Sequence, residues 1–382
     1  MNIIKRDKKR IAILSEDLLR NSGGAEAYAL NLANVLNNKY DVTIFCKEGK
    51  VDRYDVFEKY HVKPMNLCEY PFVDNDSRVK IFMQRLRMSV YLKKRIKGKY
   101  NIFINTSLNR HIAYKNICCV HLVHFPAKDY CSYLPRIIGL YLNKKYKESY
   151  QLFLANSMFT QKWLKKIWGK ESVILNPPIY TEPVKLEVVY SKKNYILMVG
   201  RLVPDKKIKE MIENFVQVIG KNNPGYKLVI AGNTNTKKQD YFNELKQIES
   251  INNNIEIKND ISYAELLCLY KNAKIFWHAA GYGVDEKKNP LLTEHFGMTT
   301  VEAMTQGCVP VAINKAGQKE IIINGVCGYL WNTIPELNEK TQQLIDDKKL
   351  TEKMAIKAIE SSKKFTLPEF KKRALFIIDN LM

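Results

Sequence analysis

Short apolar runs alternate with longer stretches of helical periodicity along most of the chain. This alternation is typical of parallel sheets whose strands are joined by covering helices. The apolar runs predict two series of strands, at residues 11–15, 41–46, 101–105, 116–123 and 151–156, and at residues 194–200, 226–232, 255–259, 273–279 and 309–314. The pattern therefore predicts an α/β protein with two doubly wound, Rossmann-like domains in tandem and a cleft between them.

A proline pair, Pro177 and Pro178, separates the two series of strands. Proline stops regular structure because it lacks an N–H donor and restricts the residue before it. The chain has 382 residues, which exceeds the usual size of one compact core. We expect an N-terminal domain, a hinge, a C-terminal domain and a final amphipathic helix that completes the first domain, at residues 1–178, 179–192, 193–366 and 367–382 respectively.

The formal net charge of +22 is unevenly distributed along the chain. Residues 1–190 contain 33 basic against 17 acidic side chains, and the remainder contains 28 against 22. Such an excess attracts polyanions, so nucleic acid, anionic lipid and phosphorylated substrates are all candidate partners. Charge alone does not choose among them.

Targeting and redox signals are sparse. The eight cysteines form no Cys-x-x-Cys pair, which indicates neither a zinc site nor a disulfide framework. The apolar run at Ile11–Leu14 predicts a first strand rather than a signal peptide. Since no stretch approaches the ~20 apolar residues of a spanning helix, we expect a cytoplasmic protein that can lie on the inner face of a membrane.

The segment TEHFGMTTVEAM, at residues 293–304, follows a long polar loop and runs into a helix expected to begin near Thr299. Main-chain amides at such a helix start form an anion site that suits a diphosphate. The carboxylates of Glu294 and Glu302 would accept hydrogen bonds from the hydroxyl groups of a sugar and a ribose. The alternative is that Thr299 and Glu302 form a capping box, in which the glutamate only satisfies a backbone donor.

Two cations follow the strand expected at 194–200, with Arg201 at the strand end and Lys206 at the entry to a helix. Two such cations can neutralise the phosphates of a leaving nucleoside diphosphate, a task that metal ions perform in other enzymes. The alternative is a solvated basic turn, which the neighbouring Lys207 and Lys209 make plausible.

Two further candidates lie in the N-terminal half. Gly23 and Gly24 link the first strand to a helix, and paired glycines let a backbone approach a ligand closely. His121 and His124 stand at the end of the strand expected at 116–123, where a histidine can act on a substrate hydroxyl or orient a sugar. The alternative for either histidine is a structural position in the core or at the strand end.

Residues 78–100 contain nine basic side chains and no acidic one. The apolar positions keep helical spacing and are Val79, Phe82, Met83, Leu86 and Val90. One apolar face on a cationic helix suits the surface of an anionic membrane. An ordinary helix that packs on its own sheet is an equally open interpretation.

Taken in order, these segments resemble glycosyltransferase family 4, the retaining group 1 glycosyl transferases of GT-B architecture. The order of six segments over nearly the whole chain supports the resemblance: 22–26, 154–164, 174–179, 200–207, 294–304 and 316–331. One departure is His295, which stands where many members have glycine and narrows the expected sugar pocket.

The resemblance implies a role for each matched residue. Glu302 would hold the donor ribose, and Glu294 would contact the donor sugar or the reacting centre. Arg201 and Lys206 would hold the diphosphate. The diphosphate would be lined by the main-chain amides of Phe296, Gly297 and Met298. The donor would also be bound by Thr299, Gly23 and Gly24.

The active-site histidine of the family follows a strand of the N-terminal domain. The His-aromatic-Pro segment at 124–126 resembles that site, so we expect His124 rather than His121 to fill it. The family also implies that the C-terminal helix crosses back onto the N-terminal domain.

The resulting hypothesis is a retaining transfer of a hexose from a nucleotide sugar to a lipid-linked or oligosaccharide acceptor in cell-surface glycan and polysaccharide biosynthesis. It needs no metal and no cofactor beyond the GDP- or UDP-sugar donor, with GDP-mannose the first to test. Expected partners are the donor, the acceptor and an anionic membrane surface, with no nucleic acid. The alternatives are a nucleotide-sugar epimerase of GT-B architecture and a basic nucleic-acid-binding protein.

Overall fold

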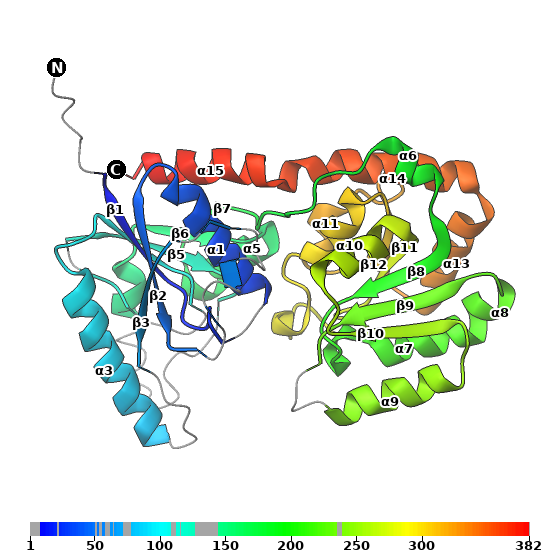
Figure 1. The fold of residues 1–382 in the computed structure, drawn as a ribbon, viewed down its shortest axis with the longest axis horizontal. Coiled ribbons are helices and arrows are strands. Elements are labelled where there is room, and N and C mark those ends of the chain that lie inside the picture. Colours follow the sequence, from blue (N-terminus) through cyan, green and yellow to red (C-terminus); the bar gives the residue numbers. More distant parts are fainter. Residues whose placement is uncertain are drawn as a thin grey trace. The chain divides into compact units, whose positions relative to one another are not determined.

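The computed structural model describes residues 8–20, 23–49, 52, 56–57, 62–63, 65–71, 78–107, 112–114, 116–126, 144–234 and 239–381. Residue Ser22 of the first matched segment lies outside these ranges, as do the side chains of Val79 and Phe82. The chain forms two compact units (Figure 1). Unit 1 comprises Met1–Pro178 with Phe370–Met382, and unit 2 comprises Ile179–Glu369.

Unit 1 is built on a seven-stranded parallel sheet in the order β3-β2-β1-β4-β5-β6-β7. Its strands are β1 (Arg10–Leu14), β2 (Asp41–Lys47), β3 (Asn66–Tyr70), β4 (Ile102–Asn105), β5 (Cys118–Val123), β6 (Leu152–Ala155) and β7 (Val173–Ile174). The sequence pattern predicted five of these and missed β3 and β7. Its helices include α1 (Gly24–Asn37), α3 (Arg78–Ile96), α5 (Met158–Trp168) and, from residue 370 on, α15 (Leu367–Asp379).

The end of the chain packs on unit 1 through α15. The rings of Tyr28 and Phe370 meet edge to face with centroids 5.8 Å apart. Near the end of the helix, Asp379 accepts a hydrogen bond of 2.7 Å from Lys39 and another from the hydroxyl of Tyr40. Residues 370–381 are therefore held by both apolar and polar contacts to the N-terminal part of the chain.

Unit 2 is built on a six-stranded parallel sheet in the order β10-β9-β8-β11-β12-β13. Its strands are β8 (Lys193–Val199), β9 (Lys227–Gly232), β10 (Ile255–Asn259), β11 (Ala273–His278), β12 (Val309–Ile313) and β13 (Tyr329–Trp331). Its helices are α6 (Leu186–Tyr190), α7 (Ile208–Asn214), α8 (Gly220–Asn222), α9 (Gln239–Ser250), α10 (Tyr263–Asn272), α11 (Met298–Thr305), α12 (Gln318–Ile321), α13 (Ile334–Asp346) and α14 (Lys348–Ser362). Residues 179–192, expected as the hinge, lie in unit 2 and contain α6.

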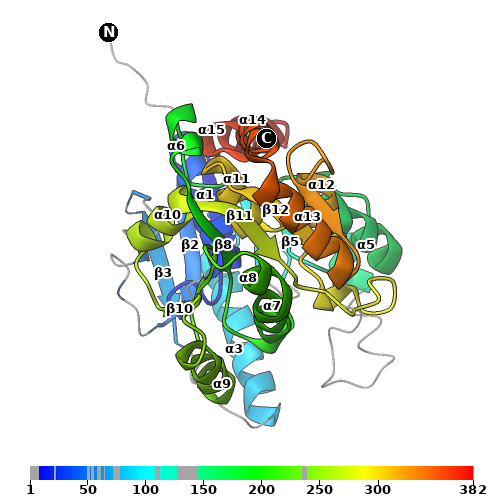
Figure 2. The ribbon, with the colours of Figure 1, turned by 90° about the vertical axis from the view of Figure 1, so that its right-hand side faces the viewer.

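Both faces of the unit 2 sheet are covered by helices (Figures 1 and 2). Ile196 and Met198 of β8 face the cluster that contains α7 and α13, whereas Tyr195 and Leu197 face the cluster that contains α10. Strands buried on both faces are continuously apolar rather than alternating. The predicted α/β class with two Rossmann-like sheets is therefore confirmed.

Function is expected at the carboxyl edge of a doubly wound sheet, where the strand order reverses. In unit 2 the reversal falls between β8 and β11, whose register pairs Ile196 with Ile275 and Leu197 with Phe276. The loops that follow these two strands therefore leave the sheet side by side. Within the described ranges, no helix combines the length and the apolarity that a membrane span requires.

The end of β9 tests how tightly this edge is packed. A Cβ atom added to Gly232 would lie 1.7 Å from the Gly200 carbonyl oxygen, at the end of β8. We expect Gly232→Ala to lower the free energy of unfolding by about 1–3 kcal/mol, since the backbone must shift to admit the methyl group. Urea titration at constant m-value measures the change.

Gly225→Ala is the matched control, because Gly225 is exposed and an added Cβ meets nothing within 4 Å. Its unfolding free energy should stay within about 0.5 kcal/mol of the parent. Equal effects of the two substitutions would contradict the close approach of β8 and β9.

Candidate functional site

Three side chains converge where the loops after β8 and β11 meet. Lys206 ends a short 3₁₀ turn (Pro204–Lys206) after β8, and its Nζ donates to Glu294 Oε2 at 2.5 Å. His278, the last residue of β11, places Nε2 3.7 Å from the same carboxylate oxygen. A cation, a carboxylate and an imidazole thus meet at the switch point of the sheet.

The charges in this group follow from burial and proximity. Burial alone would raise the pKa of Glu294, but the Lys206 ammonium and the His278 ring outweigh it and hold that pKa well below 4.5. Burial lowers the pKa of both His278 and His295 below 6.5. At neutral pH the site therefore presents an ionised Glu294 between an ammonium and a neutral imidazole.

Helix α11 begins at Met298, one residue before its expected start. Its N-cap is Gly297, with φ 119°, where an added Cβ would lie 2.4 Å from the buried Gln318 Nε2. The first amides of a helix have no acceptor within it, so those of Met298 and Thr299 give this end a partial positive charge. Phe296, just before the cap, turns its ring inward against Phe365, with centroids 5.3 Å apart.

Glu302 does not cap this helix. The capping-box interpretation of Thr299 and Glu302 is wrong because the N-cap is Gly297, which puts Thr299 second and Glu302 fifth in the helix, and no side chain bonds to the cap. Glu302 Oε2 instead accepts a hydrogen bond of 2.9 Å from the hydroxyl of Tyr270 on α10. Burial raises the pKa of Glu302, and the bond from Tyr270 offsets this only in part.

A buried ammonium holds α10 and α11 together beneath these groups. Lys192 is 9% exposed, and its Nζ donates to the carbonyls of Tyr270 at 3.2 Å, Lys271 at 3.1 Å and Gln306 at 2.7 Å. The first two carbonyls close α10 and the third follows α11. Lys192 thus serves as a shared C-terminal cap for the helices that carry Tyr270 and Glu302.

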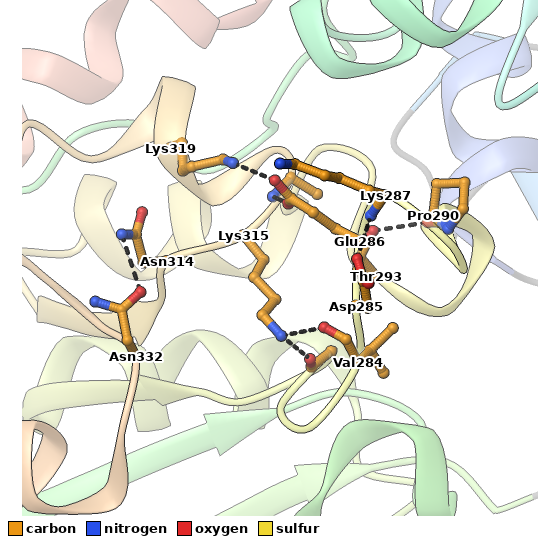
Figure 3. Close-up of polar contacts among 12 residues, drawn as sticks. Val284, Asp285, Glu286, Lys287, Pro290, Thr293, Asn314, Lys315, Lys319 and Asn332 are labelled. Carbon is orange, nitrogen blue, oxygen red and sulfur yellow. Dashed lines mark hydrogen bonds and ion pairs between the residues drawn. The ribbon is translucent and has the colours of Figure 1, made fainter.

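The long loop between β11 and α11 is tied down by residues that follow β12 (Figure 3). Lys315 Nζ donates to the carbonyl oxygens of Gly281, at 3.0 Å, and Val284. Glu286 accepts from Lys319 Nζ at 2.6 Å and from the Ala316 amide at 2.9 Å. These bonds fix the path of the chain toward Glu294, so the length of the loop does not leave that carboxylate unsupported.

Arg201 is exposed at the start of the loop after β8. Within the described part of the chain, no hydrogen bond or ion pair joins its side chain to Lys206 or Glu294. The structure therefore brings Lys206 and Glu294 together and places Arg201 at the same edge without contact.

The remaining sequence-predicted residues belong to unit 1. Gly23 is the N-cap of α1 and Gly24 its first residue, at the carboxyl edge of β1. His124 follows β5, is half-buried, and places Nε2 3.1 Å from the Thr106 carbonyl oxygen. His121 is only 2% exposed and stacks on Trp168 within an aromatic cluster. This geometry suits a structural role for His121.

Sequence reasoning missed three residues that shape the site. His278 ends an expected strand at the carboxyl edge, a signal that could have identified it. Tyr270 lies on a helix, and its pairing with Glu302 spans 32 residues without a local pattern. Gln318 is fully buried, and neither of its amide atoms has a hydrogen-bond partner among the described residues.

Comparisons with known proteins agree with this geometry. Residues 184–361 match the family described as Glycosyl transferases group 1. The chain is 26% identical over 252 residues to the GDP-Man:Man(3)GlcNAc(2)-PP-Dol alpha-1,2-mannosyltransferase of Dictyostelium discoideum, covering 61% of this chain and 48% of that protein. It is 24% identical to Alpha-1,3/1,6-mannosyltransferase ALG2 of Kluyveromyces lactis, covering 83% of this chain and 72% of that one. The chain thus spans about half the length of the first relative.

A solved structure shares the whole fold. Anabaena HepE, determined in complex with UDP and glucose, superposes with a TM-score of 0.73 at 16% identity and covers 97% of this chain and 100% of its own. This likeness shows that the two units form the GT-B fold. The Lys206–Glu294 pair and Glu302 lie inside residues 184–361, the stretch that matches the group 1 family of glycosyl transferases.

Proposed function

We propose that the protein is a retaining glycosyltransferase that moves a hexosyl group from a nucleotide sugar to a lipid-linked or oligosaccharide acceptor. The observation that carries the proposal is the Lys206–Glu294 contact of 2.5 Å beside the start of α11, within the stretch that matches the family. A fixed cation, a free helix start and an ionised carboxylate at one sheet edge suit a diphosphate joined to a sugar.

The diphosphate would bind to Lys206, Arg201 and the first amides of α11. A helix start and a cation together stabilise negative charge as it develops on the leaving phosphate. Because Glu294 already holds Lys206 in place, little side-chain freedom is left to lose when the donor arrives. Independence of metal ions is part of the proposal, since these cations would take over the task of a divalent ion.

The two carboxylates would serve different ends of the donor. Glu294, ionised at neutral pH, suits the sugar and the positive charge that grows at its anomeric carbon. Glu302, one turn into α11, would accept hydrogen bonds from the ribose hydroxyls in place of the one from Tyr270. Both act as binding groups rather than as an acid and base pair.

In the proposed reaction, the acceptor hydroxyl attacks the anomeric carbon on the face from which the nucleoside diphosphate departs. The new carbon–oxygen bond forms as the old one breaks, and a departing phosphate oxygen takes the hydroxyl proton. His124 would orient the sugar or the acceptor. Its Nε2 donates to the Thr106 carbonyl at 3.1 Å, which fixes the neutral ring as the Nε2–H tautomer.

The relatives named above suggest the partners. Both are mannosyltransferases, and the printed name of the Dictyostelium protein specifies GDP-mannose and a dolichol-linked oligosaccharide. We therefore propose GDP-mannose ahead of UDP-sugars as donor and a lipid-linked sugar as acceptor. We also propose that the protein binds an anionic membrane surface on the cytoplasmic side and that it does not bind nucleic acid.

A donor panel tests the function directly. GDP-mannose, other GDP-sugars, UDP-sugars and ADP-sugars are incubated with and without lipid-linked and phosphorylated sugar acceptors, and product is scored by mass. We expect transfer from one nucleotide class, and Glu302→Gln to raise the KM for that donor roughly 10- to 100-fold, because hydrogen bonds to a charged group contribute about 1.5–3 kcal/mol.

Glu339→Gln is the matched control, because Glu339 is an exposed glutamate on α13. Its KM should equal that of the parent. Conversion of the donor to an isomer in the absence of an acceptor would show that the protein is an epimerase and not a transferase. Consumption of no donor at all would overturn the assignment.

The raised pKa of Glu302 makes a separate prediction about stability. A carboxyl whose folded pKa lies above its unfolded value destabilises the fold increasingly as pH rises from 4.5 through the folded pKa. Glu302→Gln removes this cost and keeps an acceptor for Tyr270. We expect the variant to melt at or above the parent temperature at pH 7, with the difference shrinking toward pH 4. A variant less stable at pH 7 would contradict this.

Removal of Lys206 tests the electrostatics of the pair. Without the ammonium, burial becomes the largest influence, so the pKa of Glu294 should rise in Lys206→Met. Carbon NMR of labelled glutamate follows the titration. In the parent, ionised Glu294 stabilises the fold above pH 4.5, and this contribution is lost as pH falls through the low folded pKa. In Lys206→Met the contribution should already be missing at neutral pH.

Lys209→Met is the control, because it breaks a partly exposed contact of 3.4 Å with Glu244. It should leave the Glu294 titration unchanged. If the pKa of Glu294 is unaltered in Lys206→Met, the Lys206–Glu294 contact does not stabilise the ionised carboxylate.

A further inference from the structure

Helix α3 has two apolar faces, and one of them packs against described core residues of unit 1. Met88, Leu92 and Ile96 are at most 5% exposed and pack into the core beneath the sheet. These three residues account for α3 as an ordinary covering helix (Figure 1). The other apolar residues of the helix need a separate explanation.

The outer face of α3 combines exposed apolar and basic side chains. Met83, Leu86 and Val90 are 45%, 51% and 62% exposed. Lys93 and Lys97 are exposed as well. At about 100° per residue these five positions fall within roughly 80° of one another, on the side away from the buried face. The helix therefore presents an apolar stripe that continues into lysines.

The lysine end of this stripe opens into a basic groove. Lys93 and Lys97 line it together with Lys145, and the groove has a volume of about 760 Å³. Its lining includes Cys118, the first residue of β5, and Gln151, the residue before β6. None of its described lining residues is acidic. It lies at the amino edge of the sheet, opposite the carboxyl edge where His124 follows β5.

A second basic groove adjoins the starts of β1, β2 and β4. It is lined by Lys8, Lys9, Arg10 and Lys99, with Asp41 as its acidic residue. Arg10 lies 3.5 Å from Asp41 and offsets the negative charge of that carboxylate. The amino edge of unit 1 is thus basic across several strands.

We propose that the outer face of α3, defined by Met83, Leu86, Val90, Lys93 and Lys97 and continued by the groove that Lys145 lines, docks unit 1 on an anionic bilayer. The aliphatic side chains enter the boundary between headgroups and acyl chains, and the lysines contact lipid phosphates. The inference deepens the proposed function and rests on its lipid-linked acceptor. A bilayer fits better than nucleic acid because a polyanion in water gives three exposed aliphatic side chains nothing to enter.

Vesicle flotation without donor or acceptor tests the face. Phosphatidylcholine vesicles with and without phosphatidylserine are mixed with the full chain, and the partition coefficient is measured. We expect binding to the anionic vesicles only. Each lysine near such a surface strengthens partition roughly fivefold, so Lys93→Glu with Lys97→Glu should weaken it at least ~10-fold. Leu86→Asp should weaken it roughly threefold or more.

Matched controls separate the face from net charge. Lys349→Glu with Lys353→Glu changes an equally spaced, exposed pair on α14 of unit 2, and Ile251→Asp changes an apolar residue that is 81% exposed. Both should partition within twofold of the parent.

Equal weakening by control and face variants would overturn the inference, as would equal binding to neutral vesicles. An oligonucleotide or inorganic phosphate whose binding alone depends on Lys93 and Lys97 would overturn it in favour of a soluble anion. Donor hydrolysis, measured without vesicles in the same variants, reports separately on the proposed function and should stay unchanged.

Discussion

Parallel pairing of β8 with β11 is the constraint on which the candidate site depends. The strand order of unit 2 reverses at this pair, so the loops after β8 and β11 start from neighbouring strand ends before the chain continues to helices on opposite faces of the sheet. Lys206 and Glu294, 88 residues apart in the sequence, can meet only because these strands are neighbours. The close approach of Gly232 to Gly200 extends the same tight edge to β9.

The fold was largely predictable because most strands are buried on both faces, which leaves long apolar runs in the sequence. The sequence pattern did not predict β3 and β7, for different reasons. β3 lies at the sheet edge, and its sequence NLCEY is mixed and partly exposed. β7 has two residues, Val173 and Ile174, too few for any periodicity. Strand pairing, not local pattern, defines both.

The site was predictable in composition and less so in arrangement. Motif order selected Lys206, Glu294 and Glu302, but a linear pattern cannot tell that the first two bind each other. The capping box failed because the N-cap is Gly297, which has a positive φ and packs against Gln318, and not Thr299 two residues later. Burial raises the pKa of Glu302, whereas for Glu294 the effect of burial is outweighed by Lys206 and His278, and a local sequence pattern shows neither cause.

Lys192 has a consequence for exchanging parts between relatives. Its ammonium donates to three main-chain carbonyls at the ends of two helices, and burial lowers its pKa. Those carbonyls belong to the segment from α10 to Gln306, whereas the lysine precedes β8. A chimera that carries residues 263–307 of this chain into a relative must therefore also supply a cation near position 192. The smallest segment that can be exchanged therefore has to include position 192 and does not end at the limits of the two helices.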